Sequence, residues 1–170
     1  MHIKRFLIVL SMLLTGAGLA QAQDRSDTAR LKGEWQIEKV EARLMEQKGN
    51  GVLEAKTYTS IDDMKNINAF VPLNIKLGGH DCTMVSRAGT EKGSYTLLQN
   101  GIFRYLPESL QRQLQQQGFS PELAAHAGAE YIYRLQQSSG LVLNMPAAFY
   151  KDNNRNLAVK LVYTCYYTKK

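Results

Sequence analysis

Apolar and polar residues alternate along much of this 170-residue chain, with the period of two that is typical of half-buried β-strands. The two clearest stretches are residues 67–77 and 157–167, in which every second residue is apolar or aromatic. Near Trp35 the apolar phase shifts after Lys39, which predicts a β-bulge or a bend. The predicted strands cover residues 33–44, 52–60, 67–77, 82–86, 93–97, 102–106, 130–136, 141–145 and 157–167.

The connections between these strands are short, and Asn100-Gly101 is the strongest hairpin signal among them. Short connections favour an antiparallel meander, which has one apolar face and two open edges. Closing such a sheet into a barrel buries the face and removes the edges. We therefore predict a mostly β fold, an antiparallel meander barrel of about eight strands. Pro72 cannot donate to a ladder, so it predicts an edge position or a bulge in the strand 67–77.

One segment, residues 107–128, interrupts the β pattern with helical signals. Pro107 and Glu108 suit the first turn of a helix, and Gly118 is a natural helix end. Ser120 then has the residue type of an N-cap, directly before Pro121. Because the segment is short, we interpret it as a helical insertion in the barrel rather than a second domain.

The N-terminus has the three parts of a secretory signal peptide. Lys4 and Arg5 precede an apolar run at residues 6–14, and Ala20-Gln21-Ala22 fits the small-x-small rule for cleavage. Residues 1–22 are therefore predicted to be removed, which leaves one domain, 23–170, in the periplasm or outside the cell. An uncleaved N-terminal anchor or a buried helix is the alternative.

The charges of the predicted mature chain are scattered. Removal of Lys4 and Arg5 leaves 19 basic and 15 acidic residues, a net charge of +4. Nucleic-acid binding proteins usually cluster their basic residues, and no long basic run occurs here, so no nucleic-acid partner is expected. No segment after residue 22 is long and apolar enough to predict a membrane span.

The mature chain contains two cysteines, Cys82 and Cys165. An exported protein with an even number of cysteines is expected to pair them, so we predict a Cys82–Cys165 disulfide. A bridge closing so long a loop would stabilise the fold by about 4–5 kcal/mol in the chain-entropy model. Two buried free thiols are the alternative.

Two short motifs resemble those of the lipocalin-like, or calycin, barrels. Gly33-Glu34-Trp35 matches the Gly-x-Trp signature that opens the first strand of that superfamily. The segment 92–97, Lys-Gly-Ser-Tyr-Thr-Leu, resembles a Gly-x-Tyr-x-Leu strand common in small exported lipocalin-like proteins of Bacteroides-type bacteria. The family's Thr-Asp-Tyr motif is absent, and the insertion precedes the last strands, so a different meander barrel or a sandwich stays open.

The resemblance implies how one end of the barrel is closed. In lipocalins the signature Trp packs across the closed end, and a basic residue of the last strand stacks over it. Trp35 matches the signature Trp by position. Lys169 is the candidate for the stacking basic residue, although Arg is usual there.

No catalytic centre is evident in the chain. His80-Asp81-Cys82 contains a nucleophile and a base, but neighbouring residues of a strand point to opposite faces. The mature chain has two histidines, His80 and His126, so a three-histidine metal site is excluded. We predict no metal, no cofactor and no enzymatic activity. A hydrolase that uses His80 or clustered carboxylates is the least favoured hypothesis.

The predicted function is the binding of a small, largely apolar molecule inside the barrel. Tyrosines and other aromatic residues offer apolar faces, and Tyr adds a polar tip, which suits a ligand cavity. The alternative function is a protein-interaction or inhibitor module, with a protein partner that contacts the insertion 107–128 and its loops. The candidate ligand-binding residues are Trp35, Tyr95, Tyr133, Phe149 and Tyr163.

Overall fold

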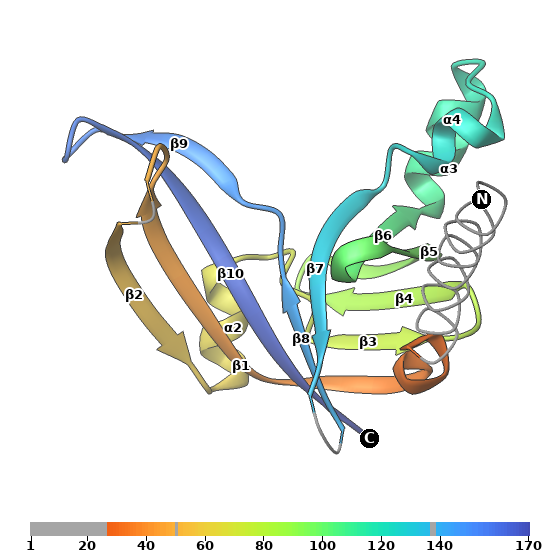
Figure 1. Ribbon diagram of the computed structural model, residues 1–170, viewed down its shortest axis with the longest axis horizontal. Helices are drawn as coiled ribbons and strands as arrows, with labels where there is room; N and C mark the ends of the chain where they lie inside the picture. The colour runs from red at the N-terminus through yellow and green to blue at the C-terminus, as the bar shows by residue number, and fades with distance from the viewer. Residues whose placement is uncertain (1–26, 50, 137–138) are drawn as a thin grey trace, which may run out of the picture.

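Ten antiparallel strands form one sheet in the computed structural model, which describes residues 27–49, 51–136 and 139–170 (Figure 1). The predicted signal peptide, residues 1–22, lies outside the described residues. The strands are β1 (Gly33–Glu46), β2 (Val52–Tyr58), β3 (Asn74–Leu77), β4 (Asp81–Ser86), β5 (Gly89–Leu98), β6 (Ile102–Pro107), β7 (Ala129–Leu135), β8 (Gly140–Asn144), β9 (Ala148–Asp152) and β10 (Leu157–Lys169).

Eight of these strands close into a barrel. They follow the order β1-β3-β4-β5-β6-β7-β8-β10, and the pairing of β1 with β10 completes the ring. The pairing of β1 with β10 shifts register between Ile37 and Lys39, where the sequence predicts a bulge. The predicted fold class, a mostly β antiparallel barrel with short helices, is confirmed.

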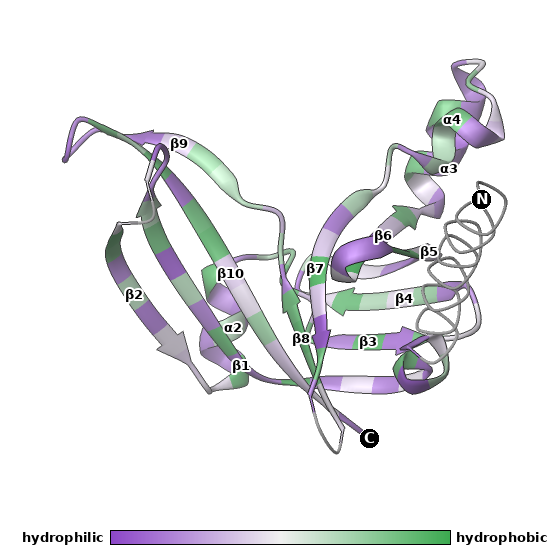
Figure 2. Ribbon diagram, viewed as in Figure 1, coloured by the Kyte–Doolittle hydropathy of each residue, from purple (hydrophilic) through white to green (hydrophobic). Residues whose placement is uncertain are grey.

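The strands β1 and β10 are long enough to leave the barrel and continue as an open extension of the same sheet, which we call the wing (Figure 1). There the outer halves of β1 and β10 still pair with each other, while β2 pairs with β1 and β9 pairs with β10. Figure 2 shows hydrophobic and hydrophilic residues interspersed along both long strands. The edge strands β2 and β9 are mostly exposed.

The predicted strand 67–77 is wrong over most of its length. Residues 61–67 form a helix, α2 (Ile61–Ile67), and regular pairing begins only at Asn74. Asp62 and Asp63 lie in the first turn of α2, where acidic side chains are favourable. Val71 and Leu73 are buried without belonging to a strand, so their apolar spacing reflects burial by an irregular segment.

The helical insertion is confirmed. It consists of α3 (Glu108–Gln116) and α4 (Pro121–Ala125), which lie between β6 and β7. The Ser120 side chain accepts a hydrogen bond from the Leu123 N–H, as expected of the N-cap of α4. None of the helices in the described ranges has the length and apolar character that crossing a bilayer requires.

Large side chains occupy the interior of the barrel. Tyr95 stacks on Phe103 with ring centroids 5.0 Å apart, and Phe103 meets Tyr131 edge-on at 6.1 Å. Most of the remaining interior residues come from alternate positions of the eight strands. They include Trp35, Ile37, Ile75, Leu77, Cys82, Met84, Tyr105, Tyr133, Leu141, Leu143, Cys165 and Tyr167.

The end of the barrel near Gly33 is closed in the way that the lipocalin resemblance implies. Trp35 is 1% exposed, and its indole N–H donates to the Leu31 carbonyl at 2.7 Å. The Lys169 ammonium lies 5.3 Å from the centroid of the Trp35 ring and donates to the Arg30 carbonyl at 2.9 Å. The helical turn 27–31 therefore serves as the cover of this end.

The opposite end is covered by α2 and the segment that follows it. Met64 of α2 and Val71 are almost fully buried in the core cluster. Two barrel tyrosines bind backbone carbonyls of this cover: Tyr167 donates to Pro72 at 2.8 Å, and Tyr163 donates to Ile67 at 3.5 Å. Both ends of the barrel are thus occupied by protein.

The predicted disulfide is wrong, because Cys82 and Cys165 are free thiols. The two residues lie on β4 and β10, which are separated in the barrel by β1 and β3 on the shorter path. A disulfide requires Cα atoms within about 7 Å, whereas neighbouring strands alone are about 4.8 Å apart. Both thiols point into the core, where burial raises the pKa of each to about 12.

Native Cys82 and Cys165 are therefore expected to resist a thiol reagent such as Ellman's reagent at pH 8. Their raised pKa lowers the thiolate fraction about a thousandfold relative to an ordinary thiol, and burial also blocks access. Both should react at once in denaturant. Because unfolded thiols ionise near pH 9, their stabilising contribution is full below that pH and declines as the pH rises toward 12. A native mass lower by two hydrogens would contradict the free-thiol state.

Candidate functional site

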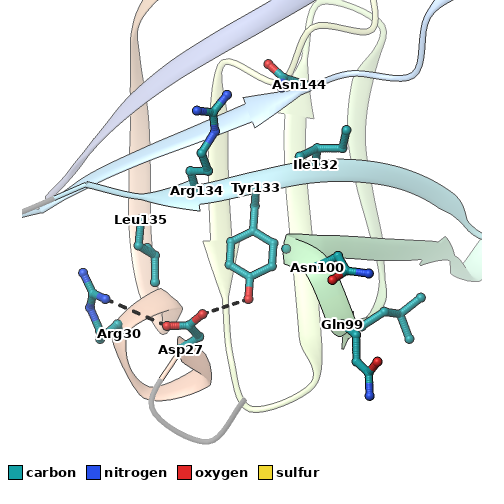
Figure 3. Close-up of a pocket in the computed structure, with 11 residues that line it drawn as sticks. Asp27, Arg30, Gln99, Asn100, Ile132, Tyr133, Arg134, Leu135 and Asn144 are labelled. Atoms are coloured by element: carbon teal, nitrogen blue, oxygen red, sulfur yellow. Dashed lines mark hydrogen bonds and ion pairs between the residues drawn. The ribbon is translucent and has the colours of Figure 1, made fainter. Parts of the chain in front are cut away.

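A surface pocket lies where the pairing of β6 with β7 ends. These strands pair only from Ile102 with Ile132 to Tyr105 with Ala129. The last part of β7 therefore runs past the beginning of β6 and faces the turn between β5 and β6. A pocket of about 950 Å³, which we call the side pocket, lies here (Figure 3). It is lined by Asp27, Arg30, Leu98, Gln99, Asn100, Gly101, Ile132, Tyr133, Arg134, Leu135 and Asn144.

The turn that borders the side pocket depends on its Asn-Gly sequence. Asn100 has φ 64° and ψ 27°, and Gly101 has φ +70°, both in the left-handed region that Asn and Gly tolerate best. A Cβ atom on Gly101 would also lie 2.9 Å from the Tyr133 carbonyl oxygen. The sequence-predicted hairpin turn is thus confirmed, and it is packed against β7 at the pocket.

A partly buried carboxylate, that of Asp27, connects the closed end of the barrel to the pocket. The Tyr133 hydroxyl donates to Asp27 Oδ2 at 3.0 Å, and Arg30 Nη1 lies 3.8 Å from Asp27 Oδ1 (Figure 3). The Asp27 side chain is 20% exposed, so most of its contact is with protein. Asp27 and Arg30 are held on the turn 27–31, which the Trp35 indole anchors through Leu31.

The lining residues combine hydrogen-bonding groups with an apolar wall. The guanidinium groups of Arg30 and Arg134 are cationic donors, and the Asn100 side chain adds an amide. Leu135 points to the same side of β7 as Tyr133, whereas Arg134 points to the other side (Figure 3). Guanidinium groups bind carboxylates well, and the apolar residues can contact a hydrocarbon body. The arrangement suits a small amphipathic molecule with an acidic group.

Only one predicted ligand-binding residue, Tyr133, lines the side pocket. Trp35, Tyr95 and Tyr163 are buried in the core, and the Tyr95 hydroxyl donates to the Gly78 carbonyl at 3.1 Å. Phe149 lies apart from them on β9 of the wing, where it is 61% exposed. These five aromatic residues therefore do not surround one central cavity, contrary to the prediction from the sequence.

The polar residues of the pocket carry almost no signal in the sequence. Asp27 and Arg30 lie in a polar lead-in without a strand pattern, and their spacing of three residues is the only local signal that they share a helical face. Arg134 is an ordinary outward position of a strand. Asp27, Arg30 and Arg134 come together only when the barrel closes and brings the turn 27–31 next to β7. The sequence pattern does not show which segments become neighbours in this way.

The His80-Asp81-Cys82 tripeptide does not form a reactive pair. His80 is exposed in the turn before β4, whereas Cys82 is 1% exposed in the core. Burial raises the pKa of the Cys82 thiol to about 12, which makes it a poor nucleophile. In the described ranges, no three His, Cys, Asp or Glu side chains are grouped so that they could hold a metal ion.

No protein-family model matches the chain. No curated protein shows significant sequence similarity to it either. The closed eight-stranded barrel, with Trp35 and Lys169 at its covered end, is consistent with a calycin-like fold. The likeness to that fold rests on this geometry alone.

Proposed function

We propose that this chain is an exported, lipocalin-like binding protein that holds a small, largely apolar molecule with one acidic group in the side pocket and does not transform it. The observation that carries the proposal is the side pocket beyond the paired part of β6 and β7, which Arg30, Tyr133 and Leu135 line together. Export rests on the predicted signal peptide, residues 1–22.

The position of the proposed site differs from that of a central ligand cavity. Aromatic rings and both end covers occupy the barrel axis, so a ligand has more room in the wall than in the centre. Arg30 would bind the acidic group, since a guanidinium forms strong charge-assisted hydrogen bonds with a carboxylate. Leu98 and Leu135 would contact the apolar body.

Decanoate and decanol are matched probes for this proposal, because they share a chain length and differ in charge. We expect decanoate to bind and Arg30→Gln to weaken it about tenfold, while decanol binding changes little, since one charge-assisted hydrogen bond contributes about 1.5 kcal/mol or more. Isothermal titration calorimetry measures both. Arg112→Gln on α3 is the control, because Arg112 is exposed and lies outside the side pocket.

Equal loss of decanoate binding in Arg30→Gln and Arg112→Gln would contradict a site at the side pocket. Absence of binding by both probes, together with no ligand retained through purification in native mass spectrometry, would reject small-molecule binding itself.

A second candidate function, the protein-interaction or inhibitor module, is favoured by two exposed apolar side chains on the insertion. Phe119 is 47% exposed and Leu123 is 62% exposed, and both lie at or near the start of α4. A partner protein with an apolar cleft would bury them. A photoreactive residue at position 119 would then cross-link to one defined partner, and Leu123→Ser would abolish the cross-link without affecting decanoate binding.

A further inference from the structure

The outward side chains of β1, β10, β8, β7 and β9 share a face that is rich in cations. Cross-strand partners point to the same side of a sheet, and Cys165 and Tyr167 point inward, so Tyr166 and its partners point outward. Successive cross-strand rows place five basic residues on this side. The cationic face, as we name it, comprises Lys39, Arg43, Arg134, Lys151 and Lys160.

These cations outnumber the acids that face them. The acids beside these cations among the described residues are Glu38, the extra residue of the bulge next to Lys39, and Glu41, which accepts hydrogen bonds from Lys39 and Arg43, each at 2.9 Å. These hydrogen bonds hold the pKa of the Glu41 carboxyl below its usual range, and the bond from Lys39 has the largest effect. Within the described ranges, the side chains of Arg134 and Lys151 have no hydrogen-bond or ion-pair partner.

A groove of about 410 Å³ crosses this face where the wing leaves the barrel. Arg43 from β1 and Arg134 from β7 both line it. Polar side chains lie between these two strands: the Asn144 amide, the Thr164 hydroxyl and the ring of Tyr166. The Lys39 ammonium lies 4.0 Å from the Tyr166 ring centroid and keeps that ring in place by a cation–π contact.

The length and chemistry of the face indicate its ligand. From Lys39 to the level of Lys160, opposite Met45, β1 advances six residues, or about 20 Å, so the cations are spread along an extended track. Guanidinium groups match oxyanions, while amides and hydroxyls match sugar hydroxyls. Nucleic acids bind on rows of stacking aromatics, whereas this face offers Tyr166 and, far from it, Phe149.

We propose that the cationic face binds an extended anionic glycan, whose carboxylate or sulfate groups are neutralised by Arg43, Arg134 and Lys160. This site is separate from the proposed function, although Arg134 and Asn144 border both the groove and the side pocket. Arg43 and Lys160 do not line the side pocket, so changes at these two residues test the glycan site alone.

The test compares two charge-reversal double variants of the full chain. Arg43→Glu/Lys160→Glu is expected to lower affinity for a galacturonate hexamer or its sulfated equivalent at least tenfold, measured by calorimetry at low salt. Lys92→Glu/Arg112→Glu changes the net charge equally on a different surface, near α3, and should leave the affinity within a factor of two. Circular dichroism verifies that both variants are folded, and decanoate binding should survive in both.

Further ligands and salt decide the class of partner. Wild-type affinity should fall as salt rises from low to physiological concentration, because exposed charges are screened, and neutral maltohexaose should not bind. The glycan proposal is overturned by equal losses in the two double variants, by absence of binding to both anionic hexamers, or by tighter binding to a single-stranded oligonucleotide of equal charge.

Discussion

Replacement of Trp35 by alanine is expected to lower the free energy of unfolding by about 3–5 kcal/mol, the range for removal of a large aromatic residue from a core. Trp35 is 1% exposed, donates to the Leu31 carbonyl at 2.7 Å and supports the Lys169 ammonium above its ring. The substitution thus leaves a cavity and also removes the hydrogen bond that anchors the turn 27–31. Urea titration followed by far-UV circular dichroism measures the change.

Two further variants separate these contributions. Trp35→Phe keeps an aromatic ring and loses the indole N–H, so its effect should fall between those of the wild type and Trp35→Ala. Lys169→Met keeps the aliphatic contact and loses the charge, and it should be milder than Trp35→Ala. A loss below about 1 kcal/mol for Trp35→Ala would contradict a cover anchored by this residue, since that is typical of surface substitutions.

Replacement of Gly93 by alanine is the second change with a large expected effect. A Cβ atom at Gly93 would overlap the Leu106 carbonyl oxygen and lie 2.8 Å from Cε2 of the Tyr105 ring. Both atoms belong to the neighbouring strand β6, whose backbone cannot yield without disturbing the barrel wall. We expect a loss of about 3 kcal/mol or more, at the upper end of overpacking effects.

Gly79→Ala is the matched control for Gly93→Ala. A Cβ atom at Gly79 would meet nothing within 4 Å, so the same chemical change should alter thermal stability little. If the two variants had the same melting temperature, the close contact between β5 and β6 at Gly93 would be refuted.

The sequence predicts the barrel well because strand periodicity is a local property. The alternation in residues 157–167 follows from a strand with one buried face, and β10 confirms it. Residues 67–73 alternate for another reason. Val71 and Leu73 belong to an irregular segment that covers one end of the barrel, and their side chains are buried there. Periodicity reports which residues are buried and not which backbone conformation buries them.

The candidate site was much less predictable than the fold. Tyr133 was identified because aromatic residues in strands are conspicuous, whereas Asp27 and Arg30 carry no pattern that relates them to β7, more than 100 residues later. The error over Cys82 and Cys165 has a similar origin. An even count of cysteines says nothing of the distance between them, which depends on the order of strands in the ring.

Charge provides a third example of what sequence order conceals. Lys39, Arg43 and Arg134 do not form a basic run in the sequence, so their positions alone do not predict a site for a polyanion. The antiparallel register of β1, β10, β8 and β7 places them on one side of the sheet. A surface of this kind becomes visible only once the strand neighbours are known.

The pairing of β1 with β10 has a consequence for how the chain is made. The first strand to leave the ribosome pairs along most of its length with the last, from Trp35 with Lys169 to Glu46 with Val159. A nascent chain that lacks its final residues cannot close the ring, and contacts so distant in sequence form slowly. The polypeptide is therefore expected to complete its barrel only after synthesis has ended.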